Sequence, residues 1–256
     1  MISRRSKQIV AAGAVLLASY LVMMLILFPA SLGWRLAEHR LETPFALEVG
    51  TVTGRVWNGE AHEIRIDGQN IGSIGWRWQP AAMLQGRLGL TLKWTSGPDH
   101  LLAELRLGRN SVAARAVRGE VRASQIQAIL DLPVLLAGRV HLDVQRIHWH
   151  VETNFHAATG VLAWTDAAAG VPQPTPLGQY RGELDSIDGN LAVRIESAPG
   201  SPLSAAGSAA WQPPDIYRVD LRLRTGDEGG QALDRVLATM GERHPDGSRR
   251  LLIQHP

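Results

Sequence analysis

Two histidines that flank a tryptophan have the spacing in this sequence that most suggests chemistry. His148 and His150 lie two positions apart, so on a β-strand both imidazoles would project from the same face. Two such imidazoles can chelate a transition metal, and His141 and His156 lie nearby in the sequence. No carboxylate or cysteine stands at a spacing that completes a tetrahedral set. We therefore interpret these histidines as solvent-facing strand residues and predict no metal site.

Motifs for nucleophilic catalysis and for nucleotide binding are missing. A nucleophile elbow reads Gly-x-Ser-x-Gly, and Gly200-Ser201-Pro202 and Gly207-Ser208-Ala209 do not match this pattern. No Gly-x-Gly-x-x-Gly lies between a predicted strand and a helix, and no phosphate-binding Gly-x-x-x-x-Gly-Lys-[Ser/Thr] occurs. We therefore predict no catalytic residue and no bound cofactor, and we expect that the protein is not an enzyme.

Tryptophan side chains are the remaining candidates for a binding role. Trp76, Trp78 and Trp94 fall on the apolar phase of predicted strands, which favours packing on the buried face of a sheet. An apolar concave face lined by tryptophan could equally hold a lipid tail or a partner strand. The sequence leaves these interpretations open.

An apolar segment near the N-terminus determines on which side of a membrane the rest of the chain is expected to lie. Ile9–Phe28 is a run of twenty residues without Asp, Glu, Lys, Arg or His. A helix rises ~1.5 Å per residue, so this run is ~30 Å long, which is the thickness of the hydrocarbon core of a bilayer. Arg4, Arg5 and Lys7 precede it, and basic residues in a short flank favour the cytoplasmic side. We predict a cytoplasmic tail at 1–8, a transmembrane anchor at 9–28, a connector at 29–45 and a periplasmic domain at 46–256.

A cleaved signal peptide is the alternative interpretation of this segment. Ser31 and Gly33 fit the small-residue pattern of a cleavage site after Gly33. The apolar region of a signal peptide has roughly 7 to 15 residues, however, and Ile9–Phe28 is longer. We expect an uncleaved anchor, and a mature protein that begins at Trp34 would show the opposite.

The composition describes a folded domain that contains no cysteine. Hydrophobic residues make up 45% of the 256 residues and charged residues 20%, which is typical of a globular protein. The 26 glycines and 14 prolines are spread along the chain and indicate many turns. Without cysteine the domain cannot form disulfides, and thiol or iron–sulfur chemistry is excluded. The net charge of +2, with acidic residues among the arginines, argues against a nucleic-acid partner.

Period-two alternation predicts a largely antiparallel sheet after residue 46. Leu88, Leu90, Leu92 and Trp94 alternate with small or polar residues, which indicates one buried face and one wet face. After Val144 the apolar phase slips, which predicts a β-bulge. Similar patterns mark strands near 64–67, 73–79, 101–107, 111–121, 140–151, 155–164, 179–185, 191–195, 203–211, 217–223 and 250–253.

Short helices and turns complete the predicted fold. Helical spacing or helix-ending residues occur at 80–86, 124–130 and 233–240, and Asp246-Gly247 predicts a turn before the last strand. Asp166–Pro176, rich in Ala and Pro, is the best candidate for a loop or an internal division. The sequence thus predicts a mainly β fold, in which one transmembrane helix precedes a curved antiparallel sheet with one apolar face and two or three short helices. A groove, a half barrel and a sandwich all fit this pattern.

A collinear series of short motifs resembles the type II secretion system protein N family. Gly50-Thr51 and the run Gly54 to Gly59 are similar to a G-T-x-W-x-G-like turn that follows a membrane anchor in that family. Ile71 to Pro80, followed by Leu84 and Gly86-Arg87-Leu88, is similar to its next segment. Weaker similarities follow in order at 160–164, 177–178, 207–211 and 237–247. The resemblance covers nearly the whole chain, with departures at Thr51-Val52-Thr53 and Ile71.

The resemblance implies a component of a type II secretion system in the cell inner membrane. We expect a single-pass protein that acts in the export of folded proteins through contacts with other type II secretion components in the periplasm. The resemblance supplies no catalytic, metal-binding or cofactor-binding residue. The alternative function is a periplasmic lipid-binding or lipid-transfer protein with an apolar β-groove. The sequence leaves the direct partner and the oligomeric state open.

Overall fold

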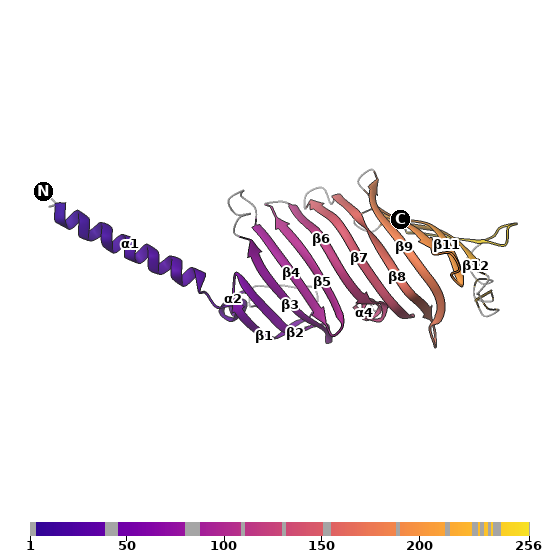
Figure 1. The fold of residues 1–256 in the computed structure, drawn as a ribbon, viewed down its shortest axis with the longest axis horizontal. Coiled ribbons are helices and arrows are strands. Elements are labelled where there is room, and N and C mark those ends of the chain that lie inside the picture. Colours follow the sequence, from indigo (N-terminus) through magenta and orange to yellow (C-terminus); the bar gives the residue numbers. More distant parts are fainter. Residues whose placement is uncertain are drawn as a thin grey trace. The chain divides into compact units, whose positions relative to one another are not determined.

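A computed structural model describes most of the chain (Figure 1). The described residues are 4–38, 46–79, 88–108, 111–129, 132–150, 155–187, 190–212, 216–226, 230, 233–234, 237 and 242–255. They fall into two compact units, Met1–Trp78 and Gln79–Pro256. The helix expected at 80–86 lies outside the described residues.

The first unit contains two helices and an antiparallel meander. Helix α1 (Arg4–Ile26) is followed by α2 (Ala30–Glu38), and Pro29 between them cannot donate a backbone hydrogen bond to continue α1. Strands β1 (Leu47–Arg55), β2 (Asn58–Ile66) and β3 (Gln69–Gln79) pair in sequence order. Asp67-Gly68 joins β2 to β3 with positive φ at both residues, which is the conformation that an Asp-Gly hairpin turn requires.

Helix α1 carries the segment predicted to be a membrane anchor. Its described side chains begin at Gly13, and the large apolar ones from Val15 to Ile26 are 53% to 72% exposed. Over the described part of the chain, no helix has the combined length and hydropathy needed to cross a membrane. The anchor at 9–28 therefore stays a prediction.

The second unit is built on an antiparallel sheet of eleven strands. From β4 to β12 each strand pairs with the next strand in the sequence. After β12 the order is β14 and then β13. Figure 1 shows β4 to β9 side by side, with β11 and β12 turned out of their plane, so the sheet is twisted. All of these strands belong to one sheet, which excludes a sandwich in the described part of this unit. The strands are β4 (Leu88–Ser96), β5 (Asp99–Leu107), β6 (Ser111–Arg122), β7 (Leu135–His150), β8 (Phe155–Gly170), β9 (Thr175–Ile187), β10 (Asn190–Ser197), β11 (Leu203–Gln212), β12 (Ile216–Thr225), β13 (Glu242–Arg243) and β14 (Arg249–His255).

The predicted β-bulge in β7 is confirmed. The pairing of β7 with β8 runs from Val144↔Gly160 to Arg146↔Thr159, so Gln145 is the extra residue. A second register shift lies between β5 and β6, where the pair Leu102↔Arg118 is followed by Glu104↔Arg115, and Ala116 in this stretch has φ of 48°. Extra residues of this kind reverse the phase of the side chains and increase the local twist.

Residues 166–176 lie inside the second unit as the paired ends of β8 and β9. Ala167↔Gly178, Ala168↔Pro176 and Ala169↔Thr175 are paired, and a turn connects the two strands. The strands therefore extend further into this Ala- and Pro-rich stretch than its composition suggests. The boundary between the two compact units lies between Trp78 and Gln79.

Helical residues cover only part of the sheet in the second unit. Helix α4 (Ala123–Ile129) packs against β6 and β7. Residues 233, 234 and 237 are helical, as predicted, whereas Val236 and Met240 lie outside the described residues. Leu237 packs with Ala205 and Leu223 in a small core, and Tyr180, Leu203, Leu221 and Leu251 lie against this core. The turn at Asp246-Gly247 before β14 is also confirmed.

Candidate functional site

The turn between β1 and β2 contacts the end of helix α1 in the first unit. Trp57 Nε1 donates a hydrogen bond to the carbonyl oxygen of Leu25 at 2.8 Å, and Val56 N donates to the Phe28 carbonyl at 3.1 Å. The last carbonyl groups of a helix lack the usual intrahelical partners, and the indole and this amide supply donors to two carbonyls at this end of the chain's first helix. The tryptophan turn, residues 54–59, therefore holds the helix end against the meander.

Glycines let the tryptophan turn close. Gly54 has φ of 82°, which favours glycine, and lies directly opposite Gly59 in the β1–β2 pair. A Cβ on Gly59 would lie 2.7 Å from both Trp76 Cζ2 and the Thr53 carbonyl oxygen. These close approaches give a physical reason for the Gly-x-x-Trp-x-Gly spacing, since larger residues would push the strands apart.

Trp76 and Trp78 of β3 complete a tryptophan cluster with Trp57. Trp76 Nε1 donates to the Val56 carbonyl at 2.8 Å, and the rings of Trp57 and Trp78 meet edge to face with centroids 5.7 Å apart. Such aromatic pairs contribute about 0.5–1.5 kcal/mol beyond the area they bury. The sequence placed Trp76 and Trp78 on a buried face. Both are half-buried, and their indoles contact the tryptophan turn at Val56 and Trp57.

One face of the sheet in the second unit is apolar from strand to strand. Residues that pair directly across antiparallel strands project from the same face. One transverse line of such residues, the apolar row, crosses ten strands and contains Leu, Ile, Trp and Gly alone. Its members are Trp94, Leu101, Gly119, Leu142, Leu162, Gly182, Ile195, Gly207, Leu221 and Leu251, and all are half-buried.

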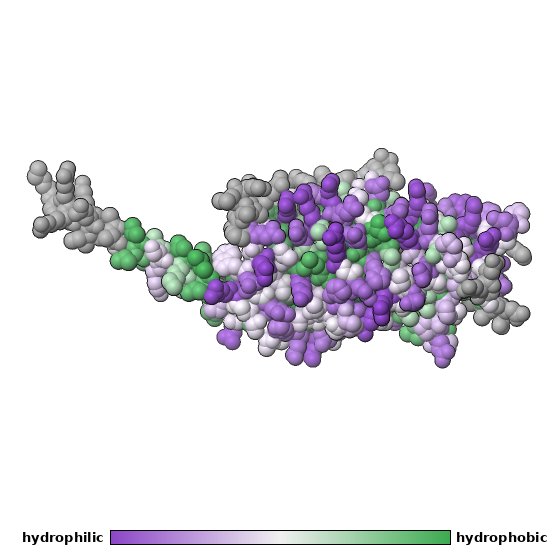
Figure 2. All heavy atoms as spheres, viewed as in Figure 1, coloured by the Kyte–Doolittle hydropathy of each residue, from purple (hydrophilic) through white to green (hydrophobic). Residues whose placement is uncertain are grey.

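Charged residues dominate the opposite face. The next transverse line of paired residues runs through Thr95, His100, Glu120, His141, Ala163, Arg181, Glu196, Ala206, Arg222 and Arg250. On the face seen in Figure 2, hydrophilic side chains cover much of the second unit. The predicted sheet with one apolar and one wet face is therefore confirmed, and Trp94 lies on the apolar face as expected.

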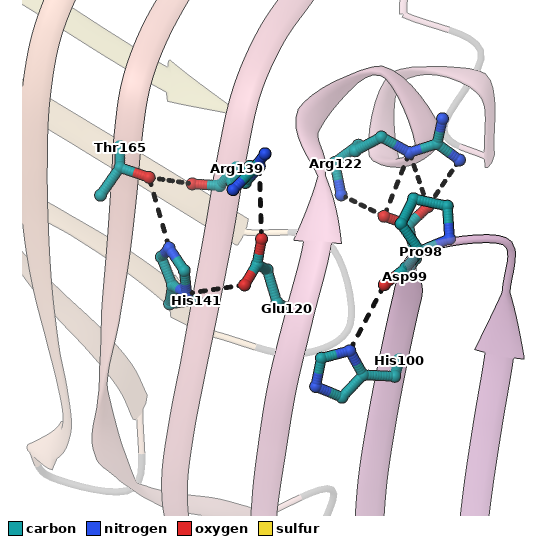
Figure 3. Close-up of polar contacts among 8 residues, drawn as sticks. All are labelled: Pro98, Asp99, His100, Glu120, Arg122, Arg139, His141 and Thr165. Carbon is teal, nitrogen blue, oxygen red and sulfur yellow. Dashed lines mark hydrogen bonds and ion pairs between the residues drawn. The ribbon is translucent and has the colours of Figure 1, made fainter.

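A buried carboxylate on this unit, that of Asp99, pairs with Arg122 (Figure 3). Arg122 Nη2 and Nε donate to Asp99 Oδ2 at 2.9 and 3.0 Å, and the Arg122 backbone N–H donates to Oδ1 at 2.9 Å. Asp99 is 2% exposed, and its hydrogen bonds raise the pKa of Arg122. The sequence did not single out this pair, because 23 residues separate its members.

A second polar group lies beside this pair on β6, β7 and β8. In Figure 3 the Glu120 carboxylate lies between Arg139 and His141, at 3.4 and 3.5 Å respectively. His141 Nε2 lies 3.3 Å from Thr165 Oγ1. These side chains are partly exposed and lie on neighbouring strands, where such contacts stabilise a sheet.

The structure places the histidines on strands, as predicted. His148 is half-buried and opposite Ala113 and Ala157, far along β7 from His141. The side chains of His150 and His156 lie outside the described residues. Within the described residues, no three His, Cys, Asp or Glu side chains gather in a group that could hold a metal ion.

The serines considered for catalysis have different surroundings. Ser201 is buried, and its hydroxyl accepts a hydrogen bond from Gln179 N at 3.2 Å. Gly178, with φ of 112°, makes room for it, because a Cβ there would collide with the Ser201 side chain. Ser201 therefore joins two strand ends.

Ser208 lies on the polar face, where it borders two hollows of about 490 and 520 Å³. Asp220, Arg222, His244 and Arg250 line the first hollow. Arg250 donates to Asp220, and this hydrogen bond is the main reason why the pKa of that carboxyl is lowered. This ion pair lies in the lining of the first hollow, which is a polar recess in the sheet surface.

Tyr180 packs against the small core of Ala205, Leu223 and Leu237. Its hydroxyl donates to the Leu203 carbonyl at 2.8 Å, and the Leu177 carbonyl lies at 3.0 Å. Burial raises the pKa of Tyr180 to about 12. This tyrosine therefore stays neutral at physiological pH and acts as a structural donor.

These features define a class of protein, an antiparallel β-sheet protein with one apolar and one charged face. Its tryptophan turn is bonded to an exposed apolar helix. A family model described as type II secretion system (T2SS), protein N, matches residues 46–251. The chain therefore belongs to the type II secretion system protein N family, which confirms the resemblance found in the sequence.

Two relatives agree with this assignment. Type II secretion system protein N of Aeromonas hydrophila is 24% identical over 97% of this chain and 98% of its own length. The Vibrio cholerae protein of the same name is 24% identical over 82% of this chain and 84% of its own length. No solved structure matches the chain significantly.

Proposed function

We propose that the protein is a non-enzymatic, inner-membrane-anchored component of a type II secretion system, which acts through contacts with other secretion components in the periplasm. The main support is the family match over residues 46–251. The described residues add a sheet with two extended faces, on which several charged side chains form ion pairs with one another. This arrangement suits binding better than chemistry.

Anchoring is the second part of the proposal. The uncharged run Ile9–Phe28 motivates it, and the exposed apolar side chains from Val15 to Ile26 support it. In addition, Trp57 of the tryptophan turn donates a hydrogen bond to the Leu25 carbonyl, which connects the helix to the strands that follow it. We propose the cytoplasmic tail at 1–8, the connector at 29–45 and the periplasmic domain at 46–256 on the same grounds.

A secretion assay tests the function. Deletion of the gene is expected to reduce the release of folded periplasmic exoproteins, and the full chain supplied in trans is expected to restore it. Affinity purification of the tagged full chain is expected to recover other secretion components. Unchanged secretion together with no recovered component would refute the proposal.

Cysteine labelling tests the topology cleanly, because the natural chain has no cysteine. Thr51→Cys is expected to react with a membrane-impermeant maleimide once the outer membrane is opened. Ser3→Cys is expected to react only after the inner membrane is broken. Equal labelling of the two variants, or a mature N-terminus at Trp34, would contradict the anchored topology.

Lipid binding is a second candidate function, supported by the apolar row. In the described part of the second unit, strands contact neighbouring strands and α4 contacts β6 and β7, but no second sheet covers the apolar face. An exposed apolar surface of this extent is typical of a binding site. After mild extraction, mass spectrometry is expected to find bound phospholipid, which Leu162→Asp removes and Leu102→Asp, on the opposite face, does not. Lipid-free wild-type protein would exclude this function.

A further inference from the structure

Helix α2 exposes its leucines and packs against the strands through small residues. Leu32 is 47% exposed and Leu36 is 67% exposed, and the two lie one helical turn apart on the same side of the helix. Ala30 is 3% exposed, and a Cβ on Gly33 would lie 3.0 Å from Val56 Cγ2 of the tryptophan turn. The side of α2 that meets the first unit therefore carries small residues, and its large apolar side chains lie on the surface.

This pattern is the reverse of the one that a water-facing surface helix usually has. Such a helix turns its apolar stripe toward the core of its own domain and its polar residues toward solvent. The polar residues Ser31 and Glu38 of α2 are also exposed, and at about 100° per residue they lie on a different side of the helix from the leucines. A short helix with separate polar and apolar exposed sides is typical of helices that lie in a membrane interface.

The place of α2 in the chain indicates what covers its leucines. The proposed anchor ends at Phe28, and α2 begins at Ala30. Two residues extend at most about 7 Å. The polar interface on each side of the hydrocarbon core is itself about 5–8 Å thick. With Phe28 at the edge of the core, α2 therefore starts inside the headgroup layer or at its outer limit.

Hydrogen bonds hold α2 and the tryptophan turn at this level. The Gly33 amide donates to the Pro29 carbonyl at 3.2 Å, and the Val56 amide donates to the carbonyl of Phe28. Trp57 donates to the Leu25 carbonyl, and an indole suits the interface because it combines an apolar ring with a polar N–H. These bonds keep the leucine side of α2 close to the last turn of the proposed anchor.

We propose that α2 is an interfacial helix that lies on the periplasmic leaflet, with Leu32 and Leu36 inserted between the headgroups and the acyl chains. The occupant of the leucine side is thus the phospholipid bilayer. The inference rests on the proposed anchoring, because two leucines alone bind a membrane weakly and need the anchor to hold them at its surface. Since α2 also contacts β1, this insertion would fix the orientation of the first unit relative to the membrane.

A fluorescent probe on α2 tests this placement in the full chain. The natural chain has no cysteine, so Leu36→Cys and the matched control Glu38→Cys, on another side of the same helix, can each carry a nitrobenzoxadiazole maleimide. Both variants are reconstituted into vesicles of phosphatidylethanolamine and phosphatidylglycerol that contain a lipid spin-labelled near the top of its acyl chain. The probe at position 36 is expected to be quenched several-fold more strongly than the probe at position 38.

Equal quenching of the two probes would overturn the proposal. A position-36 probe with blue-shifted emission that the spin-labelled lipid does not quench would overturn it as well, because protein would then cover the leucine side. Extraction with alkaline carbonate separates these results from a failure of the anchor. A chain that resists extraction while this probe stays in water refutes the interfacial helix alone, whereas a chain that is washed off refutes the anchor too.

A charge substitution gives an independent test in the Leu36→Cys background. Leu32→Asp places a carboxylate where acyl chains are expected, and burying that charge is costly. The variant is expected to reduce quenching of the probe several-fold and to leave carbonate resistance unchanged. Ser31→Asp, on the polar side, is expected to leave both unchanged. Because Leu32 is exposed, little packing is lost, and circular dichroism reports whether each variant is folded. A folded Leu32→Asp variant with full quenching would refute the insertion.

Discussion

Trp57 Nε1 and the Leu25 carbonyl oxygen lie 2.8 Å apart and join residues separated by 32 positions in the sequence. The carbonyl belongs to the last turn of α1, and the N–H of Phe28 reaches the same oxygen at 3.3 Å. The hydrogen bond ties a helix that is exposed and apolar to the meander that follows it. Its removal should free the helix end without disturbing the second unit.

Trp57→Phe is expected to keep the aromatic contact and lose this hydrogen bond, at a cost of about 1 kcal/mol in local stability. Hydrogen exchange of the full chain should accelerate at the amides of Leu27 and Val56, which are bonded in the same region. Trp164→Phe is the matched control, since Trp164 Nε1 donates to the Ala137 carbonyl at 3.0 Å in the second unit. Equal acceleration at Leu27 in both variants would contradict the assignment.

Asp99→Asn is expected to lower the melting temperature by several degrees. The substitution leaves a buried amide facing a guanidinium that has lost its counter-charge. Asp143→Asn is the control, because the Asp143–Arg118 pair lies at 3.1 Å on the exposed surface. Surface pairs contribute little, so this variant should shift the midpoint by about one degree or less. Similar shifts for the two variants would show that burial is not what makes the Asp99 pair strong.

Gly207→Ala is expected to destabilise the fold by about 1–3 kcal/mol, the usual cost of overpacking. A Cβ at Gly207 would collide with the Asp220 carbonyl oxygen and lie 2.9 Å from Leu221 Cα, and neither backbone atom can move freely. Gly182→Ala is the control on the same apolar row, where the nearest atom is the Val193 side chain at 3.3 Å. Urea denaturation of the full chain measures the difference, and equal losses would contradict the argument.

The Asp220 carboxyl is expected to titrate below its usual pKa, because Arg250 donates a hydrogen bond to the ionised form. A carboxyl whose pKa is lower in the folded state stabilises the fold above its unfolded pKa. That contribution is lost as the pH falls through the folded pKa. Arg250→Gln should therefore raise the pKa of Asp220. The free energy of unfolding of this variant should fall less steeply as the pH is lowered through the acidic range. NMR titration measures the shift, and Arg218→Gln, which removes only a charge at a distance, should change it less.

The sequence alone predicted the strand pattern well. Alternation from Leu88 to Trp94 and the phase slip after Val144 gave the two faces and the bulge, because both depend on the local period of two along a strand. The collinear glycine and tryptophan motifs led to the family. Residues 166–176 were harder to predict, because Ala and Pro favour loops locally, whereas pairing between β8 and β9 extends those strands.

The tertiary structure alone decided which distant residues meet. The bonds from Trp57 to Leu25 and from Asp99 to Arg122 join positions that no sequence period relates. The alignment of ten strands into one apolar row follows from the register of every pair, and a one-residue slip would reverse a face. Local spacing therefore determined the strands and the family, and long-range pairing determined the surfaces that the protein presents.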